Sequence, residues 1–359
     1  MKYLILTNHS YMLWQFRREL IEKLATTGEV VISTPFNGHE EDFLKKYRCI
    51  ETTIDRRSVN PIKDYLLYCF YKKLISTERP DVVVTYSIKP NIYGGYACRK
   101  LGVPYCVNVQ GLGTAFEKKW LAPIVTAMYK VALKEAKVVF FENHANASEF
   151  LERGIIKSSV TKVLNGAGVN LDTFRYSEYP KDVDGIRFLY LGRIMKEKGI
   201  DELLEAIRHL KAKYGSLIKF DMVGFFEDEY KETINSMSRN KLIDFHGFQK
   251  DPTSFYVSSH CVVLPSYHEG MSNVLLEAAA IGRPLICSDV PGCREAVENG
   301  TTGFLCKKKD ATSLQDAMEK FILLNNEERV AMGKRGREKM EQSFDKCDVV
   351  KKTIRAINK

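Results

Sequence analysis

The sequence lacks any hydrophobic run long enough to cross a membrane. A spanning helix needs roughly 18 or more consecutive apolar residues, and no stretch of these 359 residues approaches that length. The apolar run within residues 1–7 is also too short for a signal peptide, and no cleavage-site pattern follows it. We therefore interpret this run as a first strand and predict a cytoplasmic protein.

Metal-binding patterns are missing as well. The nine cysteines include no Cys-x-x-Cys pair, and the seven histidines are scattered along the chain. An odd number of irregularly spaced cysteines, most of them inside apolar runs, is typical of reduced and buried thiols. The sequence therefore predicts free thiols and no metal site.

The chain also lacks the signatures of nucleic-acid binding, because no helix-turn-helix, RNA-recognition or zinc-finger pattern is visible. Its net charge of +9 is unevenly shared. Residues 1–175 contain 25 Lys and Arg against 17 Asp and Glu, whereas residues 176–359 contain 29 against 28. The basic N-terminal half indicates an anionic ligand or surface, or else serves solubility. We expect no nucleic-acid partner.

What the sequence does contain is a regular alternation of short β-rich apolar runs with helical stretches. An apolar content of 45% and a charged content of 28% suit a globular protein, and the length suits two domains of about 150–200 residues each. Strands are expected at 2–6, 30–33, 82–85, 105–109 and 138–141, and again at 186–191, 218–223, 242–246, 261–265, 284–288 and 303–306. Helices are expected at 14–25, 61–76, 121–134 and 201–214.

This alternation predicts an α/β protein with two doubly wound, Rossmann-like parallel sheets covered by helices. Residues 172–185 lack periodicity and form the predicted joint. We therefore predict two domains that face each other across a cleft, residues 1–175 and 176–344, with a C-terminal helix at 345–359 packing back on the first. In such folds ligands bind at the carboxyl ends of the strands.

The most informative segment is PSYHEGMSNVLLEA, which follows a predicted strand. Gly270 permits a tight turn, and either Ser272 or Asn273 can cap the helix that follows. The amides at the start of that helix suit an anion such as a diphosphate. Glu269 precedes the helix, and Glu277 lies one turn beyond Asn273 on the same face. Because the helix is otherwise apolar, we interpret Glu277 as a hydrogen-bond acceptor for hydroxyl groups and not as a surface charge.

A second segment, GRIMKEKG, follows another predicted strand and opens a helix. It places Arg193 at a strand end and Lys198 at a helix start. Arginine binds phosphate oxygens through two parallel hydrogen bonds, whereas lysine supplies a point charge. Alone this pattern is weak, but beside the Glu269 and Glu277 segment it predicts a site for a phosphorylated ligand.

Together these segments resemble the donor domain of family 4 retaining glycosyltransferases, which have the GT-B fold. Glu269 and Glu277 match the Glu-x7-Glu hallmark of that family, and Arg193 with Lys198 matches its phosphate-binding pair. Further signature segments lie at 287–295 and 300–303. In the N-terminal half, the segments 86–91, 108–113 and 165–170 resemble the bacterial capsule, exopolysaccharide and O-antigen branch.

The resemblance implies a role for each matching residue. Glu277 holds the ribose hydroxyls of the donor, and Glu269 holds the hydroxyls of its sugar. Arg193 and Lys198 neutralise the diphosphate leaving group. The backbone amides expected to orient sugar and phosphate are those of Gly270, Met271, Ser272 and Asn273. The residues expected beside the nucleotide base are Phe248 and Gln249.

The acceptor side is less determined by the sequence. Many family members have a histidine where this chain has Gln110, which precedes Gly111. His144 follows another predicted strand, and we favour a structural role for it. His9 follows the first strand and either contacts substrate or caps the next helix. We list His9, Gln110, Gly111 and His144 as acceptor-side candidates.

The family resemblance implies transfer of a sugar from a nucleotide sugar, with UDP favoured, to a polyprenyl-diphosphate-linked glycan. The implied reaction retains the anomeric configuration by front-face displacement, with a diphosphate oxygen taking the acceptor proton. It needs no metal and no cofactor, because cations and helix amides meet the charge that develops on the leaving group. Two alternatives are a nucleotide-sugar 2-epimerase, which turns over the donor without an acceptor, and a sensor that binds without turnover.

The proposed acceptor is carried by lipid, so we predict a peripheral protein on the inner face of the cytoplasmic membrane. Residues 116–124 combine Lys118 and Lys119 with aromatic side chains before a helix. Such a segment fits an anionic membrane surface or, alternatively, a solvated helix end. The basic pairs that add to it are Arg17 with Arg18, Arg56 with Arg57, and Lys72 with Lys73.

Overall fold

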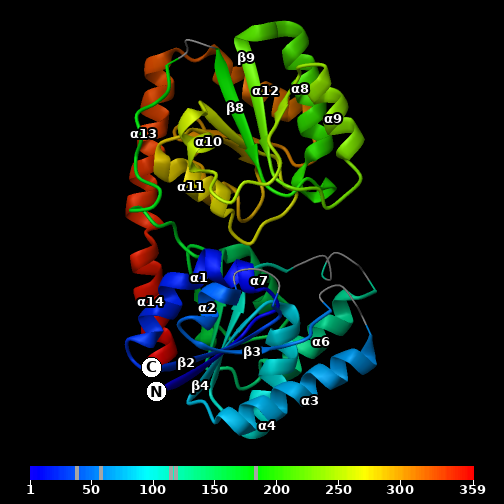
Figure 1. The fold of residues 1–359 in the computed structure, drawn as a ribbon, viewed down its shortest axis with the longest axis vertical. Helices are drawn as coiled ribbons and strands as arrows, with labels where there is room; N and C mark the ends of the chain where they lie inside the picture. Colours follow the sequence, from blue (N-terminus) through cyan, green and yellow to red (C-terminus); the bar gives the residue numbers. More distant parts are fainter. Residues whose placement is uncertain (37–39, 56–59, 113–115, 117–119, 182–184) are drawn as a thin grey trace. The chain divides into compact units, whose positions relative to one another are not determined.

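The computed structural model describes residues 1–36, 40–55, 60–112, 116, 120–181 and 185–359. These residues form two compact units, each treated by itself below (Figure 1). Unit 1 comprises Met1–Ala167 together with Asp348–Lys359, and unit 2 comprises Gly168–Cys347.

Unit 1 is built on a parallel sheet in the order β3-β2-β1-β4-β5-β6-β7. The order reverses between β1 and β4, which is where ligands bind in doubly wound folds. Its strands are β1 (Lys2–Leu6), β2 (Glu29–Thr34), β3 (Arg48–Glu51), β4 (Val82–Tyr86), β5 (Tyr105–Val109), β6 (Val138–Phe141) and β7 (Thr161–Val163). Its helices are α1 (Ser10–Ala25), α2 (Glu40–Leu44), α3 (Pro61–Glu78), the π-helix η1 (Pro90–Gly94), α4 (Gly95–Leu101), α6 (Ala122–Ala132), α7 (His144–Glu152) and most of α14 (Lys346–Asn358).

Both faces of this sheet are buried, which explains why its central strands are continuous apolar runs. Along β1 the side chains alternate: Leu4 and Leu6 join one core cluster, and Tyr3 and Ile5 join the other. Helices α3, α4, α6 and α7 cover the first cluster, and α1, α2 and α14 cover the second. The predicted parallel sheet with helices on both faces is therefore confirmed for unit 1.

Unit 2 repeats the design with a parallel sheet in the order β10-β9-β8-β11-β12-β13. Its strands are β8 (Ile186–Leu191), β9 (Ile218–Val223), β10 (Asp244–Phe245), β11 (Cys261–Leu264), β12 (Leu285–Ser288) and β13 (Gly303–Cys306). Its helices are α8 (Ile200–Tyr214), α9 (Lys231–Arg239), α10 (Thr253–Ser258), α11 (Asn273–Ile281), α12 (Ala311–Leu323) and α13 (Asn326–Ser343), with short 3-10 turns η4 (Lys196–Lys198) and η6 (Arg294–Ala296).

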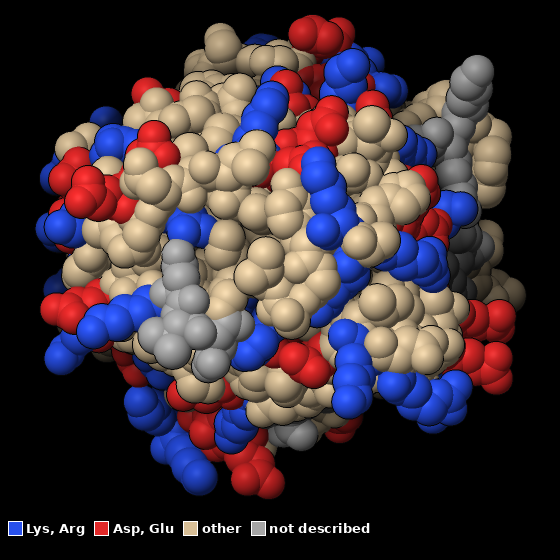
Figure 2. All heavy atoms as spheres, turned by 90° about the horizontal axis from the view of Figure 1, so that it is seen from above, with Lys and Arg blue, Asp and Glu red and all other residues tan. Residues whose placement is uncertain are grey.

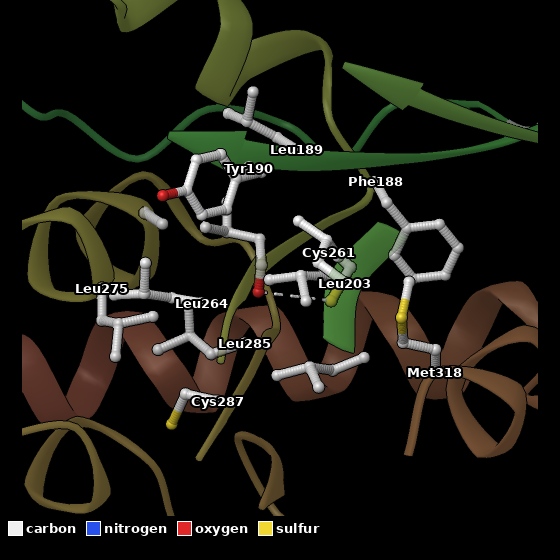
Figure 3. Close-up of a cluster of buried hydrophobic side chains, with 14 of the residues drawn as sticks. Phe188, Leu189, Tyr190, Leu203, Cys261, Leu264, Leu275, Leu285, Cys287 and Met318 are labelled. Atoms are coloured by element: carbon white, nitrogen blue, oxygen red, sulfur yellow. Dashed lines mark hydrogen bonds between the residues drawn. The ribbon is translucent and has the colours of Figure 1, made fainter. Parts of the chain in front are cut away.

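The core of unit 2 lies between this sheet and its helices. Figure 3 shows side chains from β8, β11 and β12 meeting Leu203 of α8, Leu275 of α11 and Met318 of α12. The strand order reverses between β8 and β11. The loops that follow these two strands therefore emerge side by side at the carboxyl edge of the sheet, and both predicted motifs lie in them.

The boundary between the units differs from the predicted joint at 172–185. The structure divides at Ala167 and Gly168, because the residues that follow are already fixed to unit 2. Val169 lies in the core of unit 2, and its amide donates to the carbonyl of Phe344 at 2.8 Å. Further on, Ser177 donates its amide to the carbonyl of Ile281 at 3.0 Å.

The chain returns to unit 1 in its last helix, α14. Val349 and Ile357 of α14 lie in the core of unit 1. The Lys137 ammonium donates to the carbonyl of Ile357 at 2.8 Å, and the Tyr3 hydroxyl donates to the Asn358 side chain at 3.1 Å. Both chain termini accordingly lie in unit 1 (Figure 1).

All nine cysteines are free, and six of them are buried. In the described part of the chain, no helix combines the length and the hydrophobicity that crossing a bilayer requires. The same residues contain no group of three or more His, Cys, Asp or Glu side chains arranged to hold a metal ion.

The surface charges are mixed on the face seen in Figure 2. Lysine and arginine side chains alternate there with aspartate and glutamate, and no broad field of one sign is visible. A polyanion such as nucleic acid would meet both signs of charge, so this face offers no electrostatic footprint for one.

Candidate active site

The loop after β8 begins with Gly192, which has a φ of 155°. Gly192 directly precedes Arg193, the first predicted cation. The buried Tyr190 hydroxyl donates to the carbonyl of Arg193 at 2.6 Å and thereby holds the backbone of this turn against β8. The Arg193 guanidinium is partly exposed and pairs with Glu227, with Nη1 and Oε2 at 2.5 Å. Glu227, which comes from the loop after β9, lies in no pattern that the sequence analysis could recognise.

The same loop packs onto the end of β11 through Gly199. A Cβ at Gly199 would lie 2.1 Å from the carbonyl oxygen of Pro265, and its φ of +71° also requires glycine. This close approach brings Lys198 to Glu269, and the Lys198 ammonium donates to Glu269 Oε1. Ser266 donates its hydroxyl to the same oxygen at 2.8 Å. The structure thus brings together two side chains that the sequence assigned to separate motifs.

The pair is largely shielded, with 15% of the Lys198 side chain and 14% of the Glu269 side chain exposed. Burial alone raises the pKa of the Glu269 carboxyl, but the Lys198 charge and the hydrogen bonds from Lys198 and Ser266 outweigh burial and lower the pKa below its usual value. Glu269 is therefore ionised at neutral pH and can accept hydrogen bonds from hydroxyl groups.

Gly292 closes the far side of this loop. Its φ is +84°, and a Cβ there would lie 2.5 Å from the carbonyl oxygen of Glu269. Its carbonyl accepts from the Ser272 amide at 2.8 Å, and its amide donates to Glu295 Oε2 at 2.7 Å. The segment from Glu269 to Ser272 is thus held on both sides by backbone contacts.

Helix α11 starts from this segment. Of the two predicted caps the structure selects Ser272, whose hydroxyl accepts from the Leu275 amide at 3.4 Å. Gly270 and Asn273 are partly exposed at the loop, as expected of residues that offer amides to a ligand. Met271 is buried in the core of unit 2, so its side chain packs against the core and does not line the site.

Glu277 points from α11 into a nearly closed environment and is 9% exposed. The Tyr256 hydroxyl donates to Glu277 Oε2 at 2.8 Å. Burial raises the pKa of the Glu277 carboxyl to about 7, while the Tyr256 hydrogen bond and the charge of Lys346 act in the opposite direction. Tyr256 and Lys346 were not singled out from the sequence.

Two exposed phenylalanines follow β9 and β10 at the same edge of the sheet. The rings of Phe225 and Phe248 lie 6.1 Å apart at 68°. Gln249 turns back, and its side-chain amide donates to the carbonyl of His246 at 2.8 Å. The predicted Phe248 is therefore available to a ligand. Phe225 was missed, because one aromatic residue after a strand carries no distinguishing pattern.

The four acceptor-side candidates of unit 1 follow β1, β5 and β6. Gln110 and Gly111 are partly exposed directly after β5. His144 is exposed as the first residue of α7, where Asn143 makes the cap. His9 occupies the N-cap position of α1, where the capping alternative placed it, although its side chain makes no capping hydrogen bond there.

The basic pairs of unit 1 do not all reach solvent. Arg17 is buried and pairs with Glu142, with Nη2 and Oε1 at 2.5 Å. Its guanidinium also lies over the Tyr86 ring, 5.5 Å from the centroid. Arg17 is therefore corrected from a surface cation to a buried ion pair, whereas Lys72 and Lys73 are exposed on α3. Arg18 is partly exposed and lies 4.0 Å from Glu19, measured from Nη2 to Oε1. The other four predicted cations lie outside the described residues: Arg56, Arg57, Lys118 and Lys119.

Comparison with known proteins accounts for both halves of the chain. Residues 175–339 match the family described as glycosyl transferases group 1, and residues 2–143 match the family described as glycosyl transferase 4-like. Together with these matches, the two parallel-sheet α/β units place the chain in the GT-B class of glycosyltransferases.

Individual relatives agree with this class. The chain is 26% identical over 343 residues to the N,N'-diacetylbacillosaminyl-diphospho-undecaprenol alpha-1,3-N-acetylgalactosaminyltransferase of Campylobacter jejuni, covering 89% of this chain and 88% of that protein. It is 28% identical over 288 residues to the capsular polysaccharide biosynthesis glycosyltransferase CapM of Staphylococcus aureus, with coverages of 76% and 74%. Anabaena HepE, solved with UDP-glucose, has the same fold, with a TM-score of 0.79, 17% identity and coverages of 100% and 99%.

The chain combines a glycosyl transferases group 1 domain at residues 175–339 with a glycosyl transferase 4-like domain at residues 2–143. It is a glycosyltransferase of the GT-B fold, and both the predicted family and the predicted fold are confirmed.

Proposed function

We propose that this glycosyltransferase moves a sugar from a UDP-sugar to a polyprenyl-diphosphate-linked glycan during bacterial surface polysaccharide synthesis, with retention of configuration. The observation that carries the proposal is the shielded Lys198 and Glu269 pair beside the capped start of α11. The relatives support the acceptor class, because one is named for a diphospho-undecaprenol acceptor and another for capsular polysaccharide. HepE, with the same fold, was solved with UDP-glucose.

The donor takes its orientation from side chains along one edge of the unit 2 sheet. In this proposal Glu277 accepts hydrogen bonds from the ribose hydroxyls, and Phe248 with Gln249 lies beside the base. Glu269 accepts from the sugar hydroxyls. The amides at the start of α11 face the phosphates, where the positive end of the helix favours negative charge.

The chemical step develops negative charge on the departing nucleotide diphosphate. Arg193 and Lys198 supply positive charge there, and fixed charges are worth most where charge grows in the transition state. No metal ion is needed in this scheme. The lowered pKa of Glu269 makes it a poor general base. A diphosphate oxygen of the leaving group takes the acceptor proton instead, on the same face of the sugar.

The test is a donor screen with several UDP- and GDP-sugars and a synthetic polyprenyl-diphosphate sugar. The expected result is release of UDP that depends on the acceptor, survives EDTA, and gives a product with the anomeric configuration of the donor by NMR. Turnover of the donor without an acceptor would identify a 2-epimerase instead. Loss of activity in EDTA, restored by one divalent ion, would contradict the metal-independent scheme.

Mutation of the two cations tests their assigned role. Arg193→Ala and Lys198→Ala should lower kcat more than they raise KM for the donor, because the leaving-group charge is largest in the transition state. Arg193→Lys should restore activity only in part, since lysine cannot make the bidentate hydrogen bonds of a guanidinium to phosphate oxygens. The matched control is Lys213→Ala, which removes a cation paired with Glu319 on the surface of the same unit and should leave both constants unchanged.

We further propose that unit 1 docks on an anionic membrane through the first turns of α3. Three large apolar side chains there face solvent: Ile62 at 73%, Tyr65 at 65% and Leu66 at 61% exposed. Monomeric proteins rarely expose such contiguous apolar surface without a partner. Lys72 and Lys73 follow on the same helix, a combination typical of helices that lie in the lipid interface. The partner is therefore a bilayer that contains anionic headgroups, at the inner face of the cytoplasmic membrane.

Flotation with phosphatidylglycerol liposomes tests this surface. Ile62→Glu with Leu66→Glu should weaken binding roughly tenfold or more, because two side chains no longer enter the lipid. Salt should also weaken binding by the parent protein. Leu323→Glu, at a residue of unit 2 that is 72% exposed, is the control and should bind as the parent does. Equal flotation of all three proteins would contradict the proposal.

A further inference from the structure

A tyrosine that the proposed chemistry does not use is buried directly behind Glu277. Tyr256 of α10 is fully buried, and its hydroxyl donates to Glu277 Oε2 at 2.8 Å. A hydrogen bond to a charged acceptor is stronger than one between neutral groups. The phenol therefore limits the rotation of the carboxylate and favours its ionised form.

The backbone of α10 is fastened to the end of α11 by a second buried side chain. Arg283 follows α11 and is fully buried. Its guanidinium donates to the carbonyls of Tyr256 at 3.0 Å and Val257 at 3.2 Å, and also to those of Ser177 and Glu178. Tyr256 thus approaches Glu277 from a fixed backbone, and a fixed donor is what a precisely oriented carboxylate requires.

We propose that Tyr256 is a positioning residue for the donor, which holds the Glu277 carboxylate ionised and oriented for the ribose hydroxyls. This inference rests on the proposed role of Glu277. It adds a residue that touches no substrate and acts only through its hydrogen bond to Glu277.

The electrostatic surroundings of Glu277 agree with this role. Burial raises its pKa to about 7, so small changes decide its charge near neutral pH. Tyr256 of α10 and Lys346 of α14 both lower that pKa. From the other elements packed against α11, Arg337 of α13 donates to the carbonyl of Ala280, and Arg294 of η6 pairs with Asp289. The neighbouring strands β11 and β12 contribute the thiols of Cys261 and Cys287.

The experiment is calorimetric titration with UDP from pH 6 to pH 9 on the parent, Tyr256→Phe and Glu277→Gln. Removing the phenol should raise the pKa of Glu277 further. The pH midpoint of UDP binding should then move upward by about one unit, and affinity at pH 7 should fall about fivefold. The deficit should shrink above pH 8.5, where both carboxylates are ionised. KM for the donor should rise while kcat changes little, because the ribose is remote from the bond that breaks.

The control is Tyr179→Phe, which removes a hydroxyl that donates to the carbonyl of His260 at 2.8 Å in the same unit. It should leave the pH midpoint unchanged. Incorporation of 3-fluorotyrosine at position 256 provides a variant that keeps the packing. Its more acidic phenol is a stronger donor and should move the midpoint downward. Protonation of UDP itself affects all the proteins equally, so it cancels from the difference between their pH midpoints.

The outcomes separate this inference from the function on which it rests. If Glu277→Gln binds UDP as the parent does, the ribose assignment fails. If Glu277→Gln weakens binding but neither change at position 256 moves the midpoint, the positioning role of Tyr256 is overturned while the ribose assignment stands. A loss of thermal stability in Tyr256→Phe with an unchanged midpoint would likewise reduce Tyr256 to a packing residue.

Discussion

Replacing Lys198 by methionine isolates the energetic value of the pair at the centre of the site. The substitution keeps the length of the side chain and leaves the Glu269 carboxylate with Ser266 as its remaining side-chain donor. Breaking a fully buried pair costs about 3–5 kcal/mol, and breaking an exposed one costs less than about 1 kcal/mol. Since 15% of the Lys198 side chain and 14% of the Glu269 side chain are exposed, we expect the substitution to lower the free energy of unfolding by about 2 kcal/mol. For a unit of this size, that loss lowers Tm by roughly 4–8 °C.

The sign of the pH dependence makes this test specific. In the parent, the pKa of Glu269 is lowered by folding. Its stabilising contribution is therefore present above the unfolded pKa and is lost as pH falls through the folded pKa. In Lys198→Met, the charge and hydrogen bond of Lys198 are gone, and burial outweighs the remaining Ser266 hydrogen bond and raises the folded pKa of Glu269. The variant therefore loses stability as pH rises through that raised value. The difference between the two proteins should consequently be largest at pH 7.5 and shrink toward pH 5.

Differential scanning calorimetry at both pH values measures this difference, with the unit 2 transition identified by its upward shift in UDP. Adding Glu269→Gln to Lys198→Met should recover most of the lost Tm, because the unpaired charge is gone. Lys213→Met, which breaks an exposed pair with Glu319, should cost less than about 1 kcal/mol. An equal deficit at pH 7.5 and pH 5, or no recovery in the double variant, would refute the reasoning.

Three other expectations follow from the same unit. UDP affinity of the parent should rise as pH increases through about 7, where Glu277 ionises, and Glu277→Gln should show a weaker affinity without that rise in calorimetric titration. Gly292→Ala places a Cβ 2.5 Å from the Glu269 carbonyl oxygen and should lower both Tm and kcat. The control Gly300→Ala also lies at positive φ, but its Cβ would meet open space, so it should destabilise the protein by only about 1 kcal/mol of backbone strain. Arg283→Met leaves buried carbonyls without their donor and should destabilise unit 2 by about 2–4 kcal/mol in chemical denaturation.

The central strands were predictable because each is a short run of buried apolar residues. The predicted ranges 2–6, 105–109 and 186–191 coincide with β1, β5 and β8. The edge strands β3 and β7 were missed, because they are short and only partly buried and so carry no apolar run. What the sequence pattern detects is an apolar run, which β3 and β7 lack. The edge strands of unit 2, β10 and β13, do lie within the predicted ranges 242–246 and 303–306.

At the site, too, the residues that follow a predicted strand were predictable, whereas their partners from distant segments of the chain were not. Glu269, Lys198 and Glu277 were found because each lies in a loop or helix directly after a predicted strand. Their partners come from other segments: Tyr256 belongs to an unremarkable amphipathic stretch, and Glu227 follows a different strand. Only the folded sheet brings these side chains together, so their pairing could not be inferred from spacing along the chain.

The route of the chain through the two units also sets the order in which they can fold during synthesis. Unit 2 is one continuous stretch, Gly168–Cys347, and its core is complete before the last residues are translated. The core of unit 1 needs Val349 and Ile357 from α14. Domains fold as units while the ribosome moves along the message. The half of the protein that is translated first is therefore the half that finishes folding last, once its closing helix has emerged.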